Sequence, residues 1–197
     1  MSNAIALEDL GRIKVIRFNR PEIRSPLSAF VVEKLRGLMD TIEGDAAVEA
    51  VIFTGRADVF ASGADIREIA RLNGGSAPDF ARLGQGLMKQ VETSEKMTVA
   101  AINGFCFGGA LDLALSCKRR IASPGSTFCH PGVTLGIITG WGGTQRLPRL
   151  IGEARALEMF LTARRVMAEE ARNIGLVDEV ADDPLNKAIE FAGFAQK

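Results

Sequence analysis

The stretch that decides the fold is VAAINGFCFGGALDL, residues 99–113. It opens with an apolar run typical of a buried strand, turns at a group of glycines, and continues in a pattern typical of a helix. Residues 51–66 repeat this order, with VIFT, then Gly55, then FASGADI. Helix N-termini that follow such turns can direct backbone N–H groups at one spot, where they would stabilise an oxyanion without a titratable side chain. Sharp turns that merely need glycine are the alternative interpretation.

Strands and helices alternate along the rest of the chain. Residues 5–7 and 13–18 predict a β-hairpin around Gly11, and Ser28 can cap the helix that follows. Further strands are predicted over residues 48–54, 98–102, 119–122, 127–129 and 177–180, and further helices over 65–72, 78–93, 109–116 and much of the chain beyond Gly143. The last helix, from Pro184, has one apolar face that packs on the core or belongs to an interface. This alternation predicts an α/β fold with parallel strand pairing.

The composition excludes several classes of protein. The 197 residues are 47% hydrophobic, which suits one domain with a core. The 24 basic and 24 acidic residues cancel, so no global field favours nucleic acid or a membrane surface. No apolar run is long enough to span a bilayer and no secretory signal pattern opens the chain, so we expect a cytoplasmic protein. The 3 cysteines lack CxxC spacing, which favours buried free thiols over a disulfide or a metal site.

Blocks spread over nearly the whole chain resemble the crotonase (enoyl-CoA hydratase/isomerase) superfamily, in that family's order. They are FNRP (18–21), FASGADI (60–66), INGFCFGGALDLA (102–114), GIITGWGGTQRL (136–147), and AEEA (168–171) with GLV (175–177). The resemblance implies a spiral of ββα units with a helical C-terminal part, in a single domain over residues 1–197 that lacks the family's last helices. It implies an acyl-CoA thioester as substrate, coenzyme A only as part of that substrate, and a homo-oligomer, either a trimer or a hexamer.

The resemblance also implies roles for individual residues. By matching position, the backbone N–H groups of Ala64 and Gly109 form the oxyanion hole that holds the thioester oxygen. The segment from Ser62 to Arg67 lines the adenine side of coenzyme A, and Arg24 and Ser25 approach its pantetheine and phosphates. The predicted substrate-binding residues are therefore Arg24, Ser62, Ala64, Asp65, Ile66, Arg67 and Gly109.

Two positions depart from the pattern of the family's hydratases. That pattern has one glutamate in the helix after the second glycine turn and another after the Phe-x-x-Pro block, where this chain has Asp112 and Gly132. Hydration needs a base for water and an acid for the α-carbon. Asp112 is one methylene shorter than glutamate, and at Gly132 the second carboxylate is absent. We therefore predict Asp112 as the main acid–base group and doubt an ordinary mechanism with two glutamates.

His130, the only histidine, lies two residues before Gly132. In an extended segment, residues two apart share a face, so the imidazole would project towards the pocket with a pKa suited to acid–base work. A hydrogen-bonded core histidine or a solvated one is the alternative. Trp141, which stands among glycines, is interpreted as a packing residue rather than a stacking platform.

Three kinds of function remain open at this point. The first is the addition of water to an enoyl-CoA, or the movement of its double bond. The second is a reaction that needs an enolate but only one carboxylate, such as decarboxylation of a malonyl-type thioester or thioester hydrolysis. The third is an acyl-CoA-binding protein with impaired catalysis, which the loss of the second glutamate favours.

Overall fold

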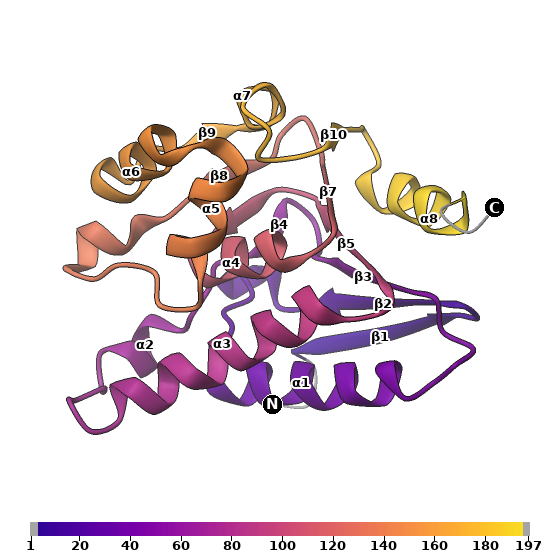
Figure 1. Ribbon diagram of the computed structural model, residues 1–197, viewed down its shortest axis with the longest axis horizontal. Helices are drawn as coiled ribbons and strands as arrows, with labels where there is room; N and C mark the ends of the chain where they lie inside the picture. Colours follow the sequence, from indigo (N-terminus) through magenta and orange to yellow (C-terminus); the bar gives the residue numbers. More distant parts are fainter. Residues whose placement is uncertain (1–3, 195–197) are drawn as a thin grey trace.

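The computed structural model describes residues 4–194 and contains a larger and a smaller β-sheet among helices (Figure 1). In spatial order, the larger sheet consists of β1 (Ile5–Leu10), β2 (Ile13–Phe18), β3 (Ala50–Thr54), β5 (Met97–Ile102), β7 (Arg119–Ala122) and β10 (Glu179–Val180). The smaller sheet consists of β4 (Val59–Ala61), β6 (Phe105–Phe107), β8 (Thr127–Cys129) and β9 (Val166–Met167). Apart from the β1–β2 hairpin and the β8–β9 pair, neighbouring strands run parallel, as predicted.

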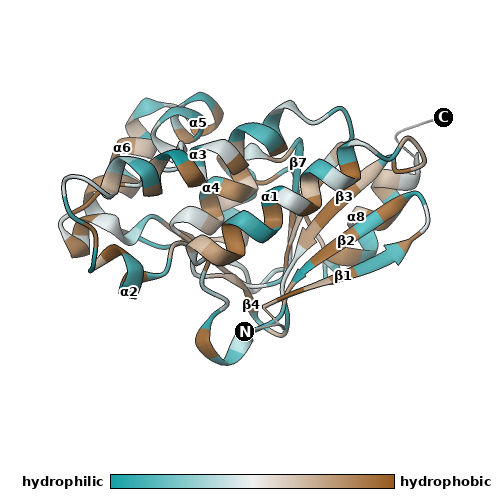
Figure 2. Cartoon of the chain, turned by 90° about the horizontal axis from the view of Figure 1, so that it is seen from below, coloured by the Kyte–Doolittle hydropathy of each residue, from teal (hydrophilic) through white to brown (hydrophobic). Residues whose placement is uncertain are grey.

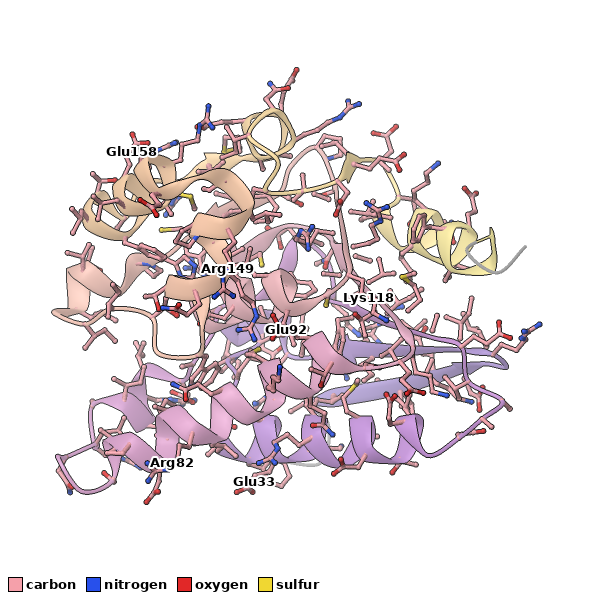
Figure 3. The ribbon with its side chains drawn as sticks, viewed as in Figure 1. Glu33, Arg82, Glu92, Lys118, Arg149 and Glu158 are labelled. Atoms are coloured by element: carbon pink, nitrogen blue, oxygen red, sulfur yellow. The ribbon has the colours of Figure 1, made fainter. Side chains whose placement is uncertain are left out.

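Helices pack around the two sheets (Figure 1). They are α1 (Ala29–Glu43), α2 (Ile66–Ile69), α3 (Ala77–Thr93), α4 (Gly109–Ser116), α5 (Gly143–Ile151), α6 (Glu153–Thr162), α7 (Ala168–Asn173) and α8 (Pro184–Phe194). Helix α1 begins where the sequence predicts, because the Ser28 hydroxyl accepts a hydrogen bond from the Val31 N–H. Helices α1 and α3 pack side by side, and both carry hydrophilic and hydrophobic bands (Figure 2). Charged side chains such as Glu33, Arg82 and Glu158 lie on the outside (Figure 3).

Helix α8 resolves an alternative that the sequence left open. Its Ala188 is fully buried against the larger sheet, in a cluster with Val15, Ile52 and Val99. Side chains of the neighbouring strand residues, such as Val51 and Phe53, point to the main core on the other face. The apolar face of α8 therefore packs on the sheet of its own chain and does not remain open as an interface.

The short strands β4 and β6 were not predicted, although they complete the units β3–β4–α2 and β5–β6–α4. Each unit passes through a glycine before its second strand. A methyl group on Gly55 would lie 1.8 Å from the Val59 carbonyl oxygen, and one on Gly104 would lie 1.9 Å from that of Asp58. Only glycine permits this approach of one backbone to another. The three-residue strands then pair with each other, which brings the starts of α2 and α4 together.

Candidate active site

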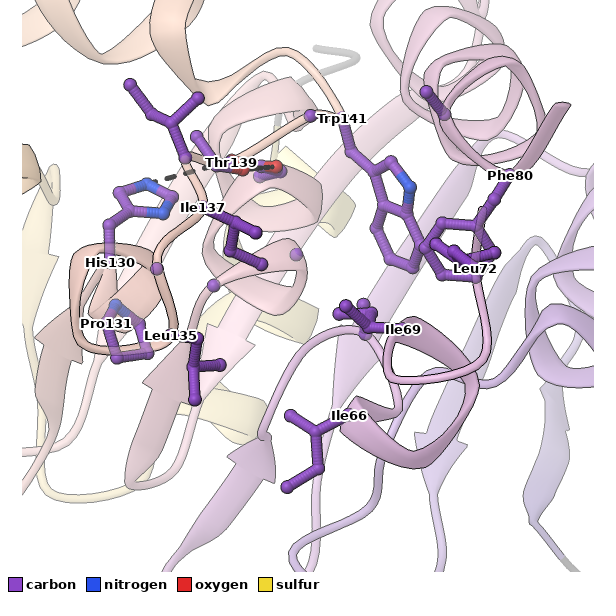
Figure 4. A pocket seen from close by; sticks show the side chains of 18 of the residues that line it. Ile66, Ile69, Leu72, Phe80, His130, Pro131, Leu135, Ile137, Thr139 and Trp141 are labelled. Carbon is purple, nitrogen blue, oxygen red and sulfur yellow. Dashed lines mark hydrogen bonds and ion pairs between the residues drawn. The ribbon is translucent and has the colours of Figure 1, made fainter. Parts of the chain in front are cut away.

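A pocket of about 220 Å³ lies beside the starts of α2 and α4. Its walls are mostly apolar, and they include Ile66, Ile69, Leu72, Phe80, Leu135, Ile137, Ile138 and Trp141. Figure 4 shows His130 and Thr139 on one side of the pocket, with Trp141 and Phe80 on the other. The same pocket is lined by every residue that the sequence nominated for catalysis, namely Ala64, Gly109, Asp112, His130 and Gly132. An apolar hollow with a few convergent polar groups is typical of a ligand site.

Two backbone amides, those of Ala64 and Gly109, approach each other at one edge of this pocket. A methyl group on Gly109 would lie 3.3 Å from the Ala64 nitrogen, and one on Gly63 would lie 2.6 Å from the Gly109 nitrogen. Gly63 has a φ of 85°, and its carbonyl accepts a hydrogen bond from the Leu27 N–H. Gly109 begins α4, so its N–H has no partner within the helix. Neither amide donates to another group among residues 4–194, so both are free to bind an oxygen atom in the pocket.

The carboxyl group of Asp112 is completely buried in the wall of the pocket. Burial raises its pKa to about 7, although a hydrogen bond from the Thr139 hydroxyl to Oδ2 acts in the opposite direction. The other oxygen, Oδ1, has no hydrogen-bond partner within the described part of the chain. A methyl group on Gly143 would lie 2.1 Å from Oδ1, so glycine at that position makes room for the carboxyl group.

His130 faces the unpartnered oxygen of Asp112, with 3.7 Å between Nε2 and Oδ1. The imidazole is 2% exposed, and neither of its nitrogens has a hydrogen-bond partner in the part of the protein that is described. Burial lowers the pKa of His130 to about 4, so the ring is neutral at pH 7. The contact is longer than a hydrogen bond and is not an ion pair at that pH. It juxtaposes a neutral imidazole and a carboxyl group that is partly protonated.

The reason given for His130 facing the pocket was wrong, although the residue does line it. Residues Pro131–Leu135 form a 3₁₀ helix rather than an extended segment, so strand alternation does not govern this stretch. Proline is suited to the start of such a turn because its φ is fixed near the helical value. His130 immediately precedes this turn, in a non-helical conformation.

At Gly132 the space for a side chain is closed by backbone. The Ile137 N–H donates a 3.0 Å hydrogen bond to the Gly132 carbonyl oxygen. A methyl group on Gly132 would lie 2.7 Å from the Ile137 carbonyl oxygen, which is too close without a shift of the chain. A side chain at position 132 therefore does not fit this backbone arrangement, and among residues 4–194 Asp112 is the one carboxylic acid that lines the pocket.

A second hollow, of about 340 Å³, shares Ser62, Ala64 and Ile66 with the first. Its other lining residues are Ile23, Arg24, Pro26, Asp65, Arg67 and Phe105. It thus collects most of the residues predicted to contact coenzyme A. Ser25 is different, because it lines neither hollow and its hydroxyl accepts a hydrogen bond from the Arg20 N–H. Ser25 therefore stabilises the local turn.

Charged groups in this second hollow are held in place. The Arg24 guanidinium lies over the Phe105 ring, 5.0 Å from its centroid. Asp65 caps α2 by accepting from the Arg67 N–H, and its carboxylate also pairs with the Arg67 guanidinium at 2.6 Å. The hydrogen bond from that guanidinium is the main reason why the pKa of Asp65 lies below its usual value. The hollow therefore combines two guanidinium groups with one ionised carboxylate.

Thr139 and Trp141 line the pocket although the sequence analysis nominated neither as a site residue. Both lie in the block over residues 136–147, where Trp141 was interpreted as a packing residue. The prediction of buried free thiols is confirmed for Cys106, Cys117 and Cys129. Within residues 4–194, no group of three or more His, Cys, Asp or Glu side chains is arranged to hold a metal ion. None of the helices in that range has the length and apolar character needed to cross a membrane.

Known proteins match this chain in sequence and in structure. A family profile described as Enoyl-CoA hydratase/isomerase matches residues 8–192. The chain is 39% identical over 193 residues to a short-chain-enoyl-CoA hydratase of Clostridium acetobutylicum, covering 96% of this chain and 74% of that protein. It is 40% identical over 177 residues to a crotonyl-CoA hydratase of Syntrophomonas wolfei, covering 89% and 68% of the two.

Solved structures agree with these matches. An enoyl-CoA hydratase from Bacillus anthracis superposes with a TM-score of 0.91 and 36% identity, covering 96% of this chain and 75% of that one. An enoyl-CoA hydratase from Thermoplasma volcanium superposes with a TM-score of 0.93 and 28% identity, covering 100% and 79%. The chain therefore belongs to the enoyl-CoA hydratase/isomerase family, as the sequence blocks predicted, and is an enzyme of the hydratase/isomerase type with the crotonase fold.

Proposed function

We propose that this enzyme adds water to the double bond of a short enoyl-CoA thioester. The observation that carries the proposal is the contact of a neutral His130 with the raised-pKa carboxyl group of Asp112, beside two free backbone donors. The names of the relatives, short-chain-enoyl-CoA hydratase and crotonyl-CoA hydratase, support a short acyl group.

The thioester oxygen is held by the N–H groups of Ala64 and Gly109. When water adds to the β-carbon, electrons move onto this oxygen and an enolate develops. Donors that are already oriented in an apolar pocket stabilise that charge, and the loss of one such donor costs roughly 2.7–4 kcal/mol of barrier. The proximity of the two nitrogens supports this role.

In this mechanism His130 takes the place of the carboxylate that is absent at position 132. The neutral imidazole accepts a proton from water as the oxygen attacks the β-carbon. Protonated Asp112 then gives its proton to the α-carbon, and the enolate collapses to the saturated thioester. The proton on His130 returns to Asp112 across the 3.7 Å contact, which restores both groups. One water molecule is thereby added, with no net change in the enzyme.

Coenzyme A occupies the second hollow as part of the substrate, and the mechanism uses no resident cofactor or metal. The hollow adjoins the pocket, because Ser62, Ala64 and Ile66 line both. The guanidinium groups of Arg24 and Arg67 favour the phosphates of coenzyme A electrostatically.

Movement of a double bond is a second candidate, favoured by Asp112 being the one carboxylic acid that lines the pocket within the described part of the chain. One acid–base group can carry a proton between the α- and γ-carbons, and such a reaction does not need His130. The two candidates are separated with the variant His130→Gln. Hydration would fall and isomerisation would persist.

The experiment that tests the proposal incubates the purified chain with crotonyl-CoA. Mass spectrometry of the product should show a gain of one water, and a 3-enoyl-CoA supplied in parallel measures isomerisation. Binding of crotonyl-CoA with no turnover of any enoyl-CoA or malonyl-CoA would contradict the proposal and support the binding protein instead.

We also propose that the enzyme is a trimer or hexamer of single-domain chains. Supporting this, Leu157 and Leu161 on α6 are 56% and 62% exposed, and Ile138 in the nearby loop is 59% exposed. Apolar side chains gathered on one surface favour association. A monomer at micromolar concentration in light scattering would contradict this assembly. The cytoplasmic location stays a prediction.

A further inference from the structure

Trp141 is a large pocket side chain that the proposed reaction does not use. The indole is 3% exposed and lines the pocket just before α5. It contacts the Phe80 ring at 5.5 Å between centroids. Figure 4 shows it across the pocket from His130, beside Leu72 and Ile69. The ring therefore forms part of the wall opposite the acid–base pair.

Two glycines leave the space that this ring fills. A methyl group on Gly84 of α3 would lie 2.2 Å from the indole Nε1, and one on Gly109 of α4 would lie 2.4 Å from Cε3. Such distances are far below the contact distance of real carbon atoms, about 3.5–4.0 Å. The indole thus occupies the positions where side chains of two helices would otherwise stand. It is wedged between α3 and α4, and the pocket is the open side.

The indole of Trp141 lies close to where the thioester end of the acyl group would bind. Gly109 supplies one of the two proposed donors to the thioester oxygen, and the benzo edge of Trp141 lies against that same residue. An acyl group bound there runs between the Asp112 side of the pocket and the Trp141 wall. Since helices hold the indole on two sides, a bulkier acyl group cannot displace it without moving a helix.

We propose that Trp141 sets the upper size of the acyl group and restricts the site to thioesters of short acids. This inference rests on the proposed function, because it takes the thioester oxygen to lie between Ala64 and Gly109.

The test measures binding rather than turnover, with the saturated thioesters butyryl-CoA and octanoyl-CoA in titration calorimetry. The wild-type enzyme should bind butyryl-CoA roughly tenfold or more tightly than octanoyl-CoA, since a rigid wall excludes extra methylenes. In Trp141→Leu that preference should shrink by roughly tenfold, mainly through tighter binding of octanoyl-CoA.

A second variant changes the wall from outside the pocket. Gly84 does not line the pocket, but in Gly84→Ala the new methyl group must push the indole towards the acyl group. Butyryl-CoA should then bind less tightly. In the double variant Gly84→Ala/Trp141→Leu the affinity for butyryl-CoA should return, because the obstructing ring is gone. Gly86→Ala is the matched control on the same helix, since its methyl group meets only the Arg36 guanidinium at 3.4 Å. It should bind like the wild type.

The possible results distinguish a failure of the role of Trp141 from a failure of the proposed hydratase function. An unchanged preference in Trp141→Leu, or no recovery in the double variant, overturns the role of Trp141 while hydration of crotonyl-CoA remains intact. Failure of the wild type to bind either thioester overturns both the role of Trp141 and the proposed function.

Discussion

The Thr139 hydroxyl donates a hydrogen bond to Oδ2 of Asp112, while Oδ1 of the same carboxyl group faces His130. Within residues 4–194, Oδ2 thus has a hydrogen-bond donor, whereas Oδ1 has no hydrogen-bond partner. One oxygen is held by a fixed donor, and the other is left for exchange of a proton with imidazole or substrate. Thr139 is in this sense a positioning residue for Asp112.

Replacing Thr139 with valine should raise the pKa of Asp112 further, because the Thr139 hydrogen bond lowers it. In the proposed mechanism the protonated form of Asp112 is active, so activity falls as pH rises through about 7. The profile of kcat/KM against pH should therefore extend to higher pH in Thr139→Val. Thr139→Ser, which keeps the hydroxyl, is the control. If kcat/KM falls at the same alkaline pH in both variants, the Thr139 hydrogen bond does not influence the ionisation of Asp112.

Replacing His130 with glutamine should lower the rate of hydration by roughly 10²–10⁴-fold, the usual contribution of a general base. Binding of butyryl-CoA should change little, since a neutral side chain of similar polarity remains. Steady-state kinetics with crotonyl-CoA and calorimetry with butyryl-CoA measure the two effects. A rate close to that of the wild type would remove His130 from the mechanism.

The buried carboxyl group should make the free energy of unfolding depend on pH. The folded-state pKa of Asp112, about 7, exceeds the ordinary value of 3.8, so its stability contribution is present below the lower value and is lost as pH rises through the higher one. The whole shift corresponds to roughly 4 kcal/mol. Urea unfolding at pH 5 and pH 8 should show wild-type stability falling, with a smaller fall in Asp112→Asn. An equal fall in both proteins would show that Asp112 titrates normally.

His130 should act in the opposite direction, because burial lowers its pKa from 6.5 to about 4. The contribution of His130 to stability is present above pH 6.5 and is lost as pH falls through about 4. Asp112 and His130 act in opposite directions between pH 7 and pH 4, so the effect of His130 is measured as a difference between proteins. In the same urea series, His130→Gln should lose less stability, or gain more, than the wild type as pH falls from 7 to 4.

Replacing Gly63 with alanine should damage the oxyanion hole. The new methyl group would lie 2.6 Å from the Gly109 nitrogen, at a residue whose φ is 85°. Displacement of that donor should lower kcat by about 10²–10³-fold with crotonyl-CoA. Gly11→Ala is the control, because it has a similar φ of 75° and nothing within 4 Å of its methyl group. If both variants lose activity equally, the effect is backbone strain and not the donor.

Local pattern explains which elements were predicted and which were missed. The strand at Ala50–Thr54 and the helix after Ser28 follow from apolar periodicity and a capping hydroxyl, and both are present. Strands β4 and β6 have 3 residues each and exist because they pair with one another, which no short window of sequence contains. The segment after His130 was misjudged because proline suits either a turn or an extended chain.

The sequence by itself determined the order of the longer strands and helices, the two glycine turns and the family, because these depend on short runs of residues. The tertiary structure alone decided that Thr139 binds Asp112, that Gly132 is closed by Ile137, and that the indole of Trp141 lies between α3 and α4. These contacts depend on how separate elements pack, and so do the burial and the pKa values that follow from it. That is why the acid–base pair could be nominated from the sequence, while its protonation state and its surroundings could not.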